Sequence, residues 1–262
     1  MFPVLFSIGP VTVYTFGFLL GTGFFLASFL IWRRLRELGR QEEKIIDLLV
    51  IGGLWGLFFS RLFYIGQNFA KFGFSFNRWL LLGRYPGLSF WGALLGFFLA
   101  LARFSKKQKA DFWQLADEIS FGILPFLILA QLGCFFDGCL LGRQTSMPWG
   151  MYFPGSLLRR QPVSLFAVVF LLLIWFFLLR IERRWRMWEW YKSKASGFVF
   201  LVFLGLLLGV SLLLAFWQDI QVYFFWLQIS LSFLGLLIIG FVFYRRSGRQ
   251  FRRSNEKEKA QK

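Results

Sequence analysis

Long, uninterrupted apolar segments constrain this chain more than any other feature of its sequence. Seven of them approach the roughly 20 residues that a membrane-crossing helix needs. They cover residues 11–32, 45–64, 88–104, 112–132, 163–179, 197–217 and 222–244. The segments are continuous rather than alternating, unlike those of a transmembrane β-barrel, and an open sheet leaves backbone groups unsatisfied in lipid. We therefore predict an all-α polytopic membrane protein with about seven transmembrane helices.

The composition agrees with this fold class. Of the 262 residues, 57% are hydrophobic and 16% are charged, whereas soluble domains have about 45–50% and about 25%. We predict one transmembrane helical domain over residues 1–244, with outward-facing loops at 65–87 and 133–162. The N-terminus lacks the charged n-region of a signal peptide, so the first segment is expected to stay in the membrane. The basic tail, 245–262, is predicted to be disordered.

Lysine and arginine are distributed unevenly between the connections. The connections after the first, third and fifth segments, together with the tail, carry 23 of the 30 Lys and Arg residues, and the connections on the opposite side carry 6. Positive charge marks the cytoplasmic side. The N-terminus is therefore predicted outside and the C-terminus in the cytoplasm. The net charge of +17 fits this topology and attraction to anionic membrane lipids, so we predict no nucleic-acid partner.

Few residues are suited to metal binding or acid–base chemistry. Histidine is absent and there are two cysteines, Cys134 and Cys139. A metal site would need more ligands than these, so we predict no metal and no cofactor. A disulfide is allowed in an oxidising compartment, and a reactive thiol would need a neighbouring base or cation. The remaining alternative is that both cysteines are buried, unreactive thiols, and this is the one that we expect.

The outward loops hold the polar residues with the clearest chemical potential. Gly133, Gly138 and Gly142 permit close backbone approach, and Arg143 follows them on a side where positive charge is scarce. A guanidinium can bind a phosphate with two parallel hydrogen bonds. The Arg159-Arg160 pair has the same potential. The alternative for all three is a set of interfacial arginines.

Ionisable groups inside the apolar segments form a second set of candidates. Arg61 lies within the second segment, where a charge is costly and usually faces a partner or a cavity. Asp117 and Glu118 lie near the start of the fourth segment. Carboxylates also suit the N-terminal end of a helix because of its dipole, which is the reading that we favour for Glu118.

The order of several short motifs resembles that of a known family. The motifs are Ile8-Gly9-Pro10-Val11, Ser60-Arg61-Leu62-Phe63-Tyr64, Gly87-Leu88-Ser89-Phe90-Trp91-Gly92, the run from Gln131 to Arg143, Pro148-Trp149-Gly150, Phe153-Pro154-Gly155 and Arg160-Gln161-Pro162. Together they resemble bacterial prolipoprotein diacylglyceryl transferases from about residue 5 to about residue 219. The family topology of seven helices with the N-terminus outside matches the topology deduced from the charges.

The resemblance implies a reaction. It implies transfer of the diacylglyceryl group of phosphatidylglycerol to the thiol of the lipobox cysteine in a preprolipoprotein, at the bacterial plasma (inner) membrane, with glycerol phosphate as the leaving group. In this sequence we expect Arg143 and Asp137 to be the catalytic residues. We expect substrate to be bound by Arg61, Ser89, Gln131, Gly133, Gly138, Gly142 and Arg160.

The sequence departs from the family at most of its polar catalytic positions. Trp91 stands where the family has its essential histidine, and Gln131 stands where it has arginine. Cys134, Asp137 and Cys139 replace two asparagines and a glutamate, Gln161 replaces a second histidine, and Phe16 replaces a tyrosine. The arginine and glutamate of the penultimate helix have no counterpart. Two hypotheses follow: a divergent enzyme that uses Arg143, Arg61 and Arg160 for phosphate and Asp137 or Asp117 as proton acceptor, or an inactive relative that binds phospholipid or lipobox peptide without turnover.

Overall fold

The computed structural model describes residues 4–9, 11–74, 78–79, 87–153, 156–182, 184 and 195–247. These residues form two compact units, one from residues 31–119 and the other from residues 1–30 and 120–262. Helices α1 (Thr15–Glu37) and α6 (Phe112–Asp137) each contribute residues to both units. The tail that we predicted to be disordered lies mostly outside the described residues.

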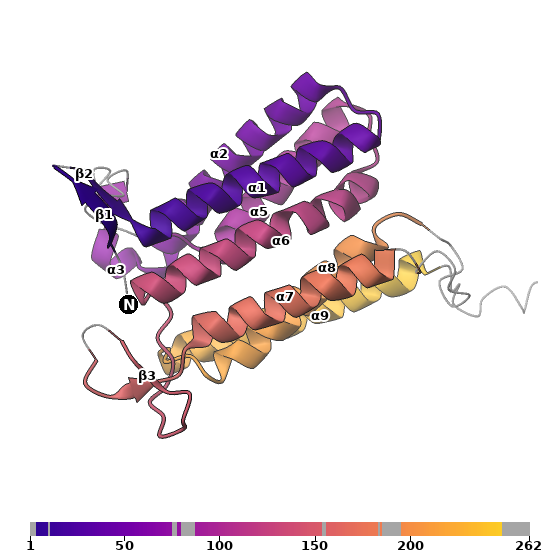
Figure 1. Ribbon diagram of the computed structural model, residues 1–262. Helices are drawn as coiled ribbons and strands as arrows, with labels where there is room; N and C mark the ends of the chain where they lie inside the picture. The colour runs from indigo at the N-terminus through magenta and orange to yellow at the C-terminus, as the bar shows by residue number, and fades with distance from the viewer. Residues whose placement is uncertain are drawn as a thin grey trace, which may run out of the picture. The chain divides into compact units, whose positions relative to one another are not determined.

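The unit of residues 31–119 is built on two helices that lie side by side, α2 (Glu42–Gln67) and α5 (Phe90–Lys107) (Figure 1). Glycines allow their close approach. A Cβ at Gly92 would lie 2.6 Å from the Phe59 carbonyl oxygen, and one at Gly52 would lie 2.9 Å from the ring of Phe97. Small residues are the usual means of close helix packing in membranes because lipid gives no hydrophobic drive between helices. Helix α3 (Phe69–Phe72) follows α2.

The other unit contains α7 (Val163–Glu182), α8 (Phe198–Ala215) and α9 (Val222–Arg246), in which α8 packs against both neighbours (Figure 1). Buried Val163, Ala167 and Leu214 form one apolar cluster between α7 and α8. Gln228 of α9 donates its amide to the Ser211 carbonyl of α8 at 3.1 Å. Most of α9 remains exposed, as expected of a helix that faces lipid.

Two short antiparallel hairpins complete the described part. Strand β1 (Val4–Ile8) pairs with β2 (Val11–Tyr14), and β3 (Met151–Tyr152) pairs with β4 (Arg159–Arg160). The first hairpin corrects our prediction of a helix from residue 11, because α1 begins at Thr15. The reason is local: Val11, Thr12 and Val13 are followed by Tyr14, and β-branched and aromatic residues favour an extended chain.

The seven predicted helices are confirmed, with bounds that differ by a few residues. Helices α6, α7 and α9 begin at the predicted residues, 112, 163 and 222. Within the described part, six helices are long and apolar enough to cross a membrane. The remaining long helix, α5, has 18 residues and includes three basic ones near its end, Arg103, Lys106 and Lys107. The chain is therefore an all-α multi-pass membrane protein with two small hairpins.

Candidate functional site

Arg61 lies on α2 and is 8% exposed. Its Nε donates to the Trp79 carbonyl at 2.9 Å, and its Nη1 and Nη2 donate to the Gly87 and Arg78 carbonyls, each at 3.0 Å. Its Cζ lies 5.1 Å from the ring centroid of Phe72. All three guanidinium nitrogens thus donate to backbone oxygens, so Arg61 ties residues 78, 79 and 87 to α2.

Ser60 and Ser89 tie the start of α5 to α2 beside Arg61. The Ser89 N–H donates to the Ser60 carbonyl at 3.1 Å, and the Ser60 hydroxyl donates to the Ser89 carbonyl at 2.9 Å. Ser89 is buried. Trp91, at the family histidine position, packs edge to face on Phe90 with ring centroids 5.1 Å apart. The start of α5 is therefore held to α2 by hydrogen bonds of Ser60 and Ser89, and it presents an aromatic side chain where the family has a histidine.

The C-terminal end of α6 carries the central family motif. Gly133 lies against Phe16 of α1, where an added Cβ would come within 3.2 Å of the Phe16 Cα. Two positions of the family pattern, the tyrosine replaced by Phe16 and the glycine, thus touch. Two residues earlier, the Oε1 atom of Gln131 is buried without a hydrogen-bond partner among the described residues. A buried acceptor without a hydrogen-bond partner is costly. Packing alone therefore does not account for a glutamine at this position.

Cys134 and Cys139 form a disulfide across the end of α6, with Cα atoms 5.2 Å apart. This corrects our expectation of two buried thiols, because Cys134 is buried but Cys139 is exposed. Helix α6 ends at Asp137, and Gly138 takes φ 75°. The Gly138 and Cys139 N–H groups both donate to the Cys134 carbonyl, at 2.9 and 3.1 Å. The left-handed glycine of this cap turns the chain back, and that brings the two sulfurs together.

Asp137 is exposed at this helix end. Its carboxylate has no ion pair with any residue that the structure describes. It is therefore an open acceptor beside the disulfide.

Residues 141–143 form an extended segment held between two others. On one side, Gly142 bridges Gln218, Arg143 N–H donates to the Trp217 carbonyl at 2.8 Å, and Asp219 N–H donates to the Leu141 carbonyl at 3.1 Å. On the other side, Gln161 N–H donates to the Arg143 carbonyl at 3.1 Å. A Cβ at Gly142 would lie 2.7 Å from the Gln161 Cβ, so glycine is required for this close approach.

The Arg143 guanidinium is exposed and only partly engaged. Its Nε donates to the Gln218 carbonyl at 3.3 Å, and its Cζ lies 5.7 Å from the ring centroid of Phe225. Nη1 and Nη2 make no hydrogen bond to any residue of the described ranges. Two parallel donors thus remain open on a side chain that is fixed at its base, which is the arrangement that a phosphate accepts.

Arg160 is placed differently, although it lies next to the same segment. Its Nη1 donates to the Gly142 carbonyl at 3.3 Å and pairs with the Asp219 carboxylate, while its Nε donates to the Ser156 hydroxyl at 3.1 Å. Its side chain is 18% exposed. Arg160 therefore joins three parts of the loop region, whereas Nη1 and Nη2 of Arg143 have no partner among the described residues.

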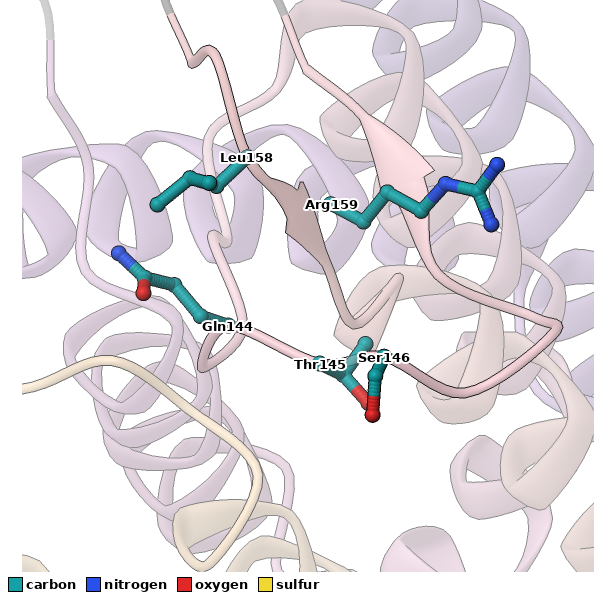
Figure 2. Close-up of a pocket in the computed structure, with 5 residues that line it drawn as sticks. All are labelled: Gln144, Thr145, Ser146, Leu158 and Arg159. Atoms are coloured by element: carbon teal, nitrogen blue, oxygen red, sulfur yellow. The ribbon is translucent and has the colours of Figure 1, made fainter.

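A shallow open hollow of about 330 Å³ lies on the loop beyond Arg143, lined by Gln144, Thr145, Ser146, Leu158 and Arg159. Figure 2 shows the Arg159 guanidinium pointing away from the side on which Gln144 and Leu158 lie. Its Cζ lies 5.5 Å from the ring centroid of Tyr152. The hollow is therefore lined by both polar and apolar groups, and the Arg159 guanidinium points away from Gln144 and Leu158.

Asp117 and Glu118 lie in the first half of α6. The Glu118 carboxylate pairs with Arg34 of α1 at 3.0 Å, and both side chains are about one quarter exposed. Asp117 is 8% exposed. Glu118 is thus neutralised by the basic end of α1.

The predicted site residues fall into two groups. Gly142, Arg143 and Arg160 are in direct contact, and Gly133, Asp137 and Gly138 lie on the preceding helix end. Arg61 and Ser89 belong to the other compact unit. Sequence reasoning missed Asp219, Gln218 and Phe225, which hold or flank the two arginines. The only available signal was Asp219, the single carboxylate between two apolar helices.

The fold defines a multi-pass helical membrane protein, and its loop carries an arginine whose donors suit an anionic group. Comparison with known proteins agrees with that class: a profile of the prolipoprotein diacylglyceryl transferase family matches residues 3–246. The chain belongs to this family, which is a family of transferases.

Three relatives named phosphatidylglycerol–prolipoprotein diacylglyceryl transferase illustrate the similarity. The protein of Glaesserella parasuis is 34% identical over 68% of this chain and 67% of its own length. That of Pasteurella multocida is 33% identical over 73% and 69%, and that of Vibrio vulnificus is 36% identical over 66% and 68%. The resemblance deduced from the motifs is therefore confirmed.

Proposed function

We propose that this chain transfers the diacylglyceryl group of phosphatidylglycerol to the lipobox cysteine of a preprolipoprotein in the bacterial plasma (inner) membrane. Family membership and the names of its relatives support the reaction. The distribution of Lys and Arg supports a bilayer orientation with the N-terminus and the loop of residues 133–162 outside. Lipid would reach the site from the membrane, and peptide from the outer surface.

The observation that carries the proposal is the Arg143 guanidinium, anchored through Nε with Nη1 and Nη2 open. In the reaction, the substrate thiolate attacks the glyceryl carbon, a C–S bond forms, and the C–O bond to the phosphate breaks. Negative charge grows on the departing glycerol phosphate. Two fixed donors aimed at that charge stabilise the transition state more than the ground state. Gly133 and Gly142, which pack on Phe16 and Gln161, and Gly138, at the helix cap, would shape the loop that the substrate contacts.

Asp137 is our candidate for the proton acceptor. A thiol is a poor nucleophile until it loses its proton, and the exposed Asp137 carboxylate stands at the end of α6 without an ion pair among the described residues. Asp137→Asn keeps the shape and removes the base. We expect it to lower kcat about 10²–10⁴-fold, as loss of general-base catalysis does, with little change in phosphatidylglycerol binding. Equal kcat in this variant and the wild type would remove Asp137 from the reaction.

Arg61, Ser89, Gln131 and Arg160 remain proposed as substrate-binding residues in a supporting sense. Arg61 and Arg160 already donate to protein oxygens. They would therefore act by fixing the loops that contact lipid. Gln131 has an open buried oxygen that would accept a hydrogen bond from a hydroxyl of the headgroup.

A second candidate function is binding of phospholipid or lipobox peptide without turnover. The observation that favours it is chemical: Trp91 stands at the histidine position, and Cys139, in a disulfide, stands at the glutamate position. Neither group transfers a proton. This candidate predicts a chain that binds phosphatidylglycerol and leaves the peptide unmodified.

The test is transfer by the full chain in phosphatidylglycerol nanodiscs with a lipobox peptide, read by peptide mass. We expect a diacylglyceryl adduct that disappears when the acceptor cysteine of the peptide is replaced by serine. Lipid binding with no adduct over many hours would support the second candidate and contradict the first.

A further inference from the structure

We propose that Asp219 is a positioning residue for Arg143, and that it acts through Arg160. The expected effect on catalysis rests on the proposed function. The expected effect on the position of Arg143 does not. Asp219 lies in the turn between α8 and α9, which begins after Ala215 and ends at Gln221. This turn is far from the family motifs at residues 131–143 in sequence and contacts them directly in space.

Three chain segments lie side by side at this point. Residues 141–143 form the central one, residues 217–219 flank it on one side, and residues 160–161 flank it on the other. Each contact is a backbone hydrogen bond of 2.8–3.1 Å. The direction of Arg143 is therefore set by a small sheet-like arrangement whose outer segments come from the chain before α7 and the turn after α8.

Asp219 closes this arrangement with a charged contact. The Arg160 side chain passes over the central segment, donates to the Gly142 carbonyl at 3.3 Å and pairs with the Asp219 carboxylate on the far side. The Asp219 N–H also donates to the Leu141 carbonyl at 3.1 Å. One guanidinium thus joins all three segments, and Asp219 is its terminal partner.

The charge balance assigns the two arginines different roles. Asp219 neutralises Arg160, whose side chain is 18% exposed. No carboxylate of the described residues pairs with Arg143, so Arg143 keeps its positive charge for an anionic ester. The Asp219 side chain is 54% exposed, so the pair adds little to global stability. Its effect is the local geometry of Arg143, and small misplacements of a binding group are expensive in rate.

The experiment compares Asp219→Ala, Asp219→Asn and Asp219→Glu in the full chain in nanodiscs. We expect Ala and Asn to lower kcat about tenfold and to raise KM for phosphatidylglycerol, with KM for the peptide and the melting temperature unchanged. Glu should recover most of the rate because it keeps the carboxylate. Glu37→Ala is the matched control, since it removes the carboxylate of an exposed ion pair with Arg33 and should change nothing.

A double-mutant cycle with Arg160→Ala tests the route of the effect. If Asp219 acts through Arg160, Asp219→Ala should cost nothing further in the Arg160→Ala background. Fully additive losses, or no effect of Asp219→Ala, would overturn the proposal.

Two readouts separate this proposal from the proposed function. If the wild type transfers nothing, the function fails, and the positioning role is still tested by phosphatidylglycerol titration and by hydrogen exchange of the Arg143 amide. We expect Asp219→Ala to weaken lipid binding several-fold and to speed exchange at residues 141–143. Unchanged binding and exchange would overturn the role of Asp219 whether or not the enzyme is active.

Discussion

Arg61 and Arg143 are both arginines of family motifs, and the structure uses them in opposite ways. Arg61 is buried, and all three of its nitrogens donate to the carbonyls of Trp79, Arg78 and Gly87. Arg143 is exposed, with one nitrogen on the Gln218 carbonyl and two without partners among the described residues. An arginine in a membrane protein can thus stabilise the fold or bind an anion. The number of its donors without a protein partner distinguishes the two roles.

The comparison also separates stability from chemistry. A buried guanidinium that loses its partners, or carbonyls that lose their guanidinium, cost folding free energy. An exposed guanidinium with open donors contributes little to folding and can bind an incoming anion. We therefore expect substitution of Arg61 to lower the free energy of unfolding, and substitution of Arg143 to lower the rate of diacylglyceryl transfer.

The largest effect on folding is expected from Arg61→Ala. Hydrogen bonds to a charged group contribute about 1.5–3 kcal/mol each. Arg61→Ala removes three such bonds, and water can replace part of them at the freed carbonyls. We therefore expect the free energy of unfolding to fall by about 3–5 kcal/mol. Thermal unfolding in detergent measures it.

Arg103→Ala is the matched control for Arg61. It removes an exposed arginine of the same compact unit that has no partner among the described residues, so it should melt close to the wild type. If Arg61→Ala and the wild type melt at the same temperature, the three carbonyl contacts of Arg61 do not stabilise the fold, and the contrast with Arg143 fails.

A smaller effect on folding is expected from removing the disulfide at the end of α6. A cross-link that closes so short a loop stabilises by about 2 kcal/mol in the chain-entropy account. Cys134→Ala combined with Cys139→Ala should lower the free energy of unfolding by about 2 kcal/mol, seen as a lower melting temperature. Reductant on the wild type should lower the melting temperature as much as the double substitution does. Reductant should not affect the double variant.

Thiol labelling checks the same bond. Because Cys139 is exposed, it should react with a maleimide only after reduction. Rapid labelling of the untreated wild type would contradict the disulfide.

The helices were predictable from sequence, and the contacts of the site were not. Phe112, Val163 and Val222 begin helices where the apolar segments begin, because length and hydropathy decide membrane helices almost alone. The hairpin of residues 4–14 was missed because its strands run into the apolar segment of α1. Here β-branched residues, not hydropathy, decide the conformation.

The missed site contacts are long-range. Asp219 meets Arg160 across 59 positions, and Gln218 meets Arg143 across 75; no local pattern encodes either pair. The expectation of two buried thiols was wrong because five positions of separation across a helix end join two cysteines only if the cap turns back. Gly138 provides that turn. The roles of Arg143 and Asp137 in the reaction remain predictions.

The most direct test of the account is diacylglyceryl transfer by Arg143→Ala beside its matched control, Arg159→Ala. Both variants remove one exposed arginine from the same loop, but Arg159 rests on Tyr152, and Arg143 holds the open donors. With phosphatidylglycerol nanodiscs and a lipobox peptide, we predict that Arg143→Ala lowers kcat about 10²–10³-fold, as loss of a transition-state donor does. Its melting temperature should not change, and Arg159→Ala should transfer at close to the wild-type rate. Equal rates for the two variants, in a wild type that is active, would contradict the assignment of Arg143 to the phosphate.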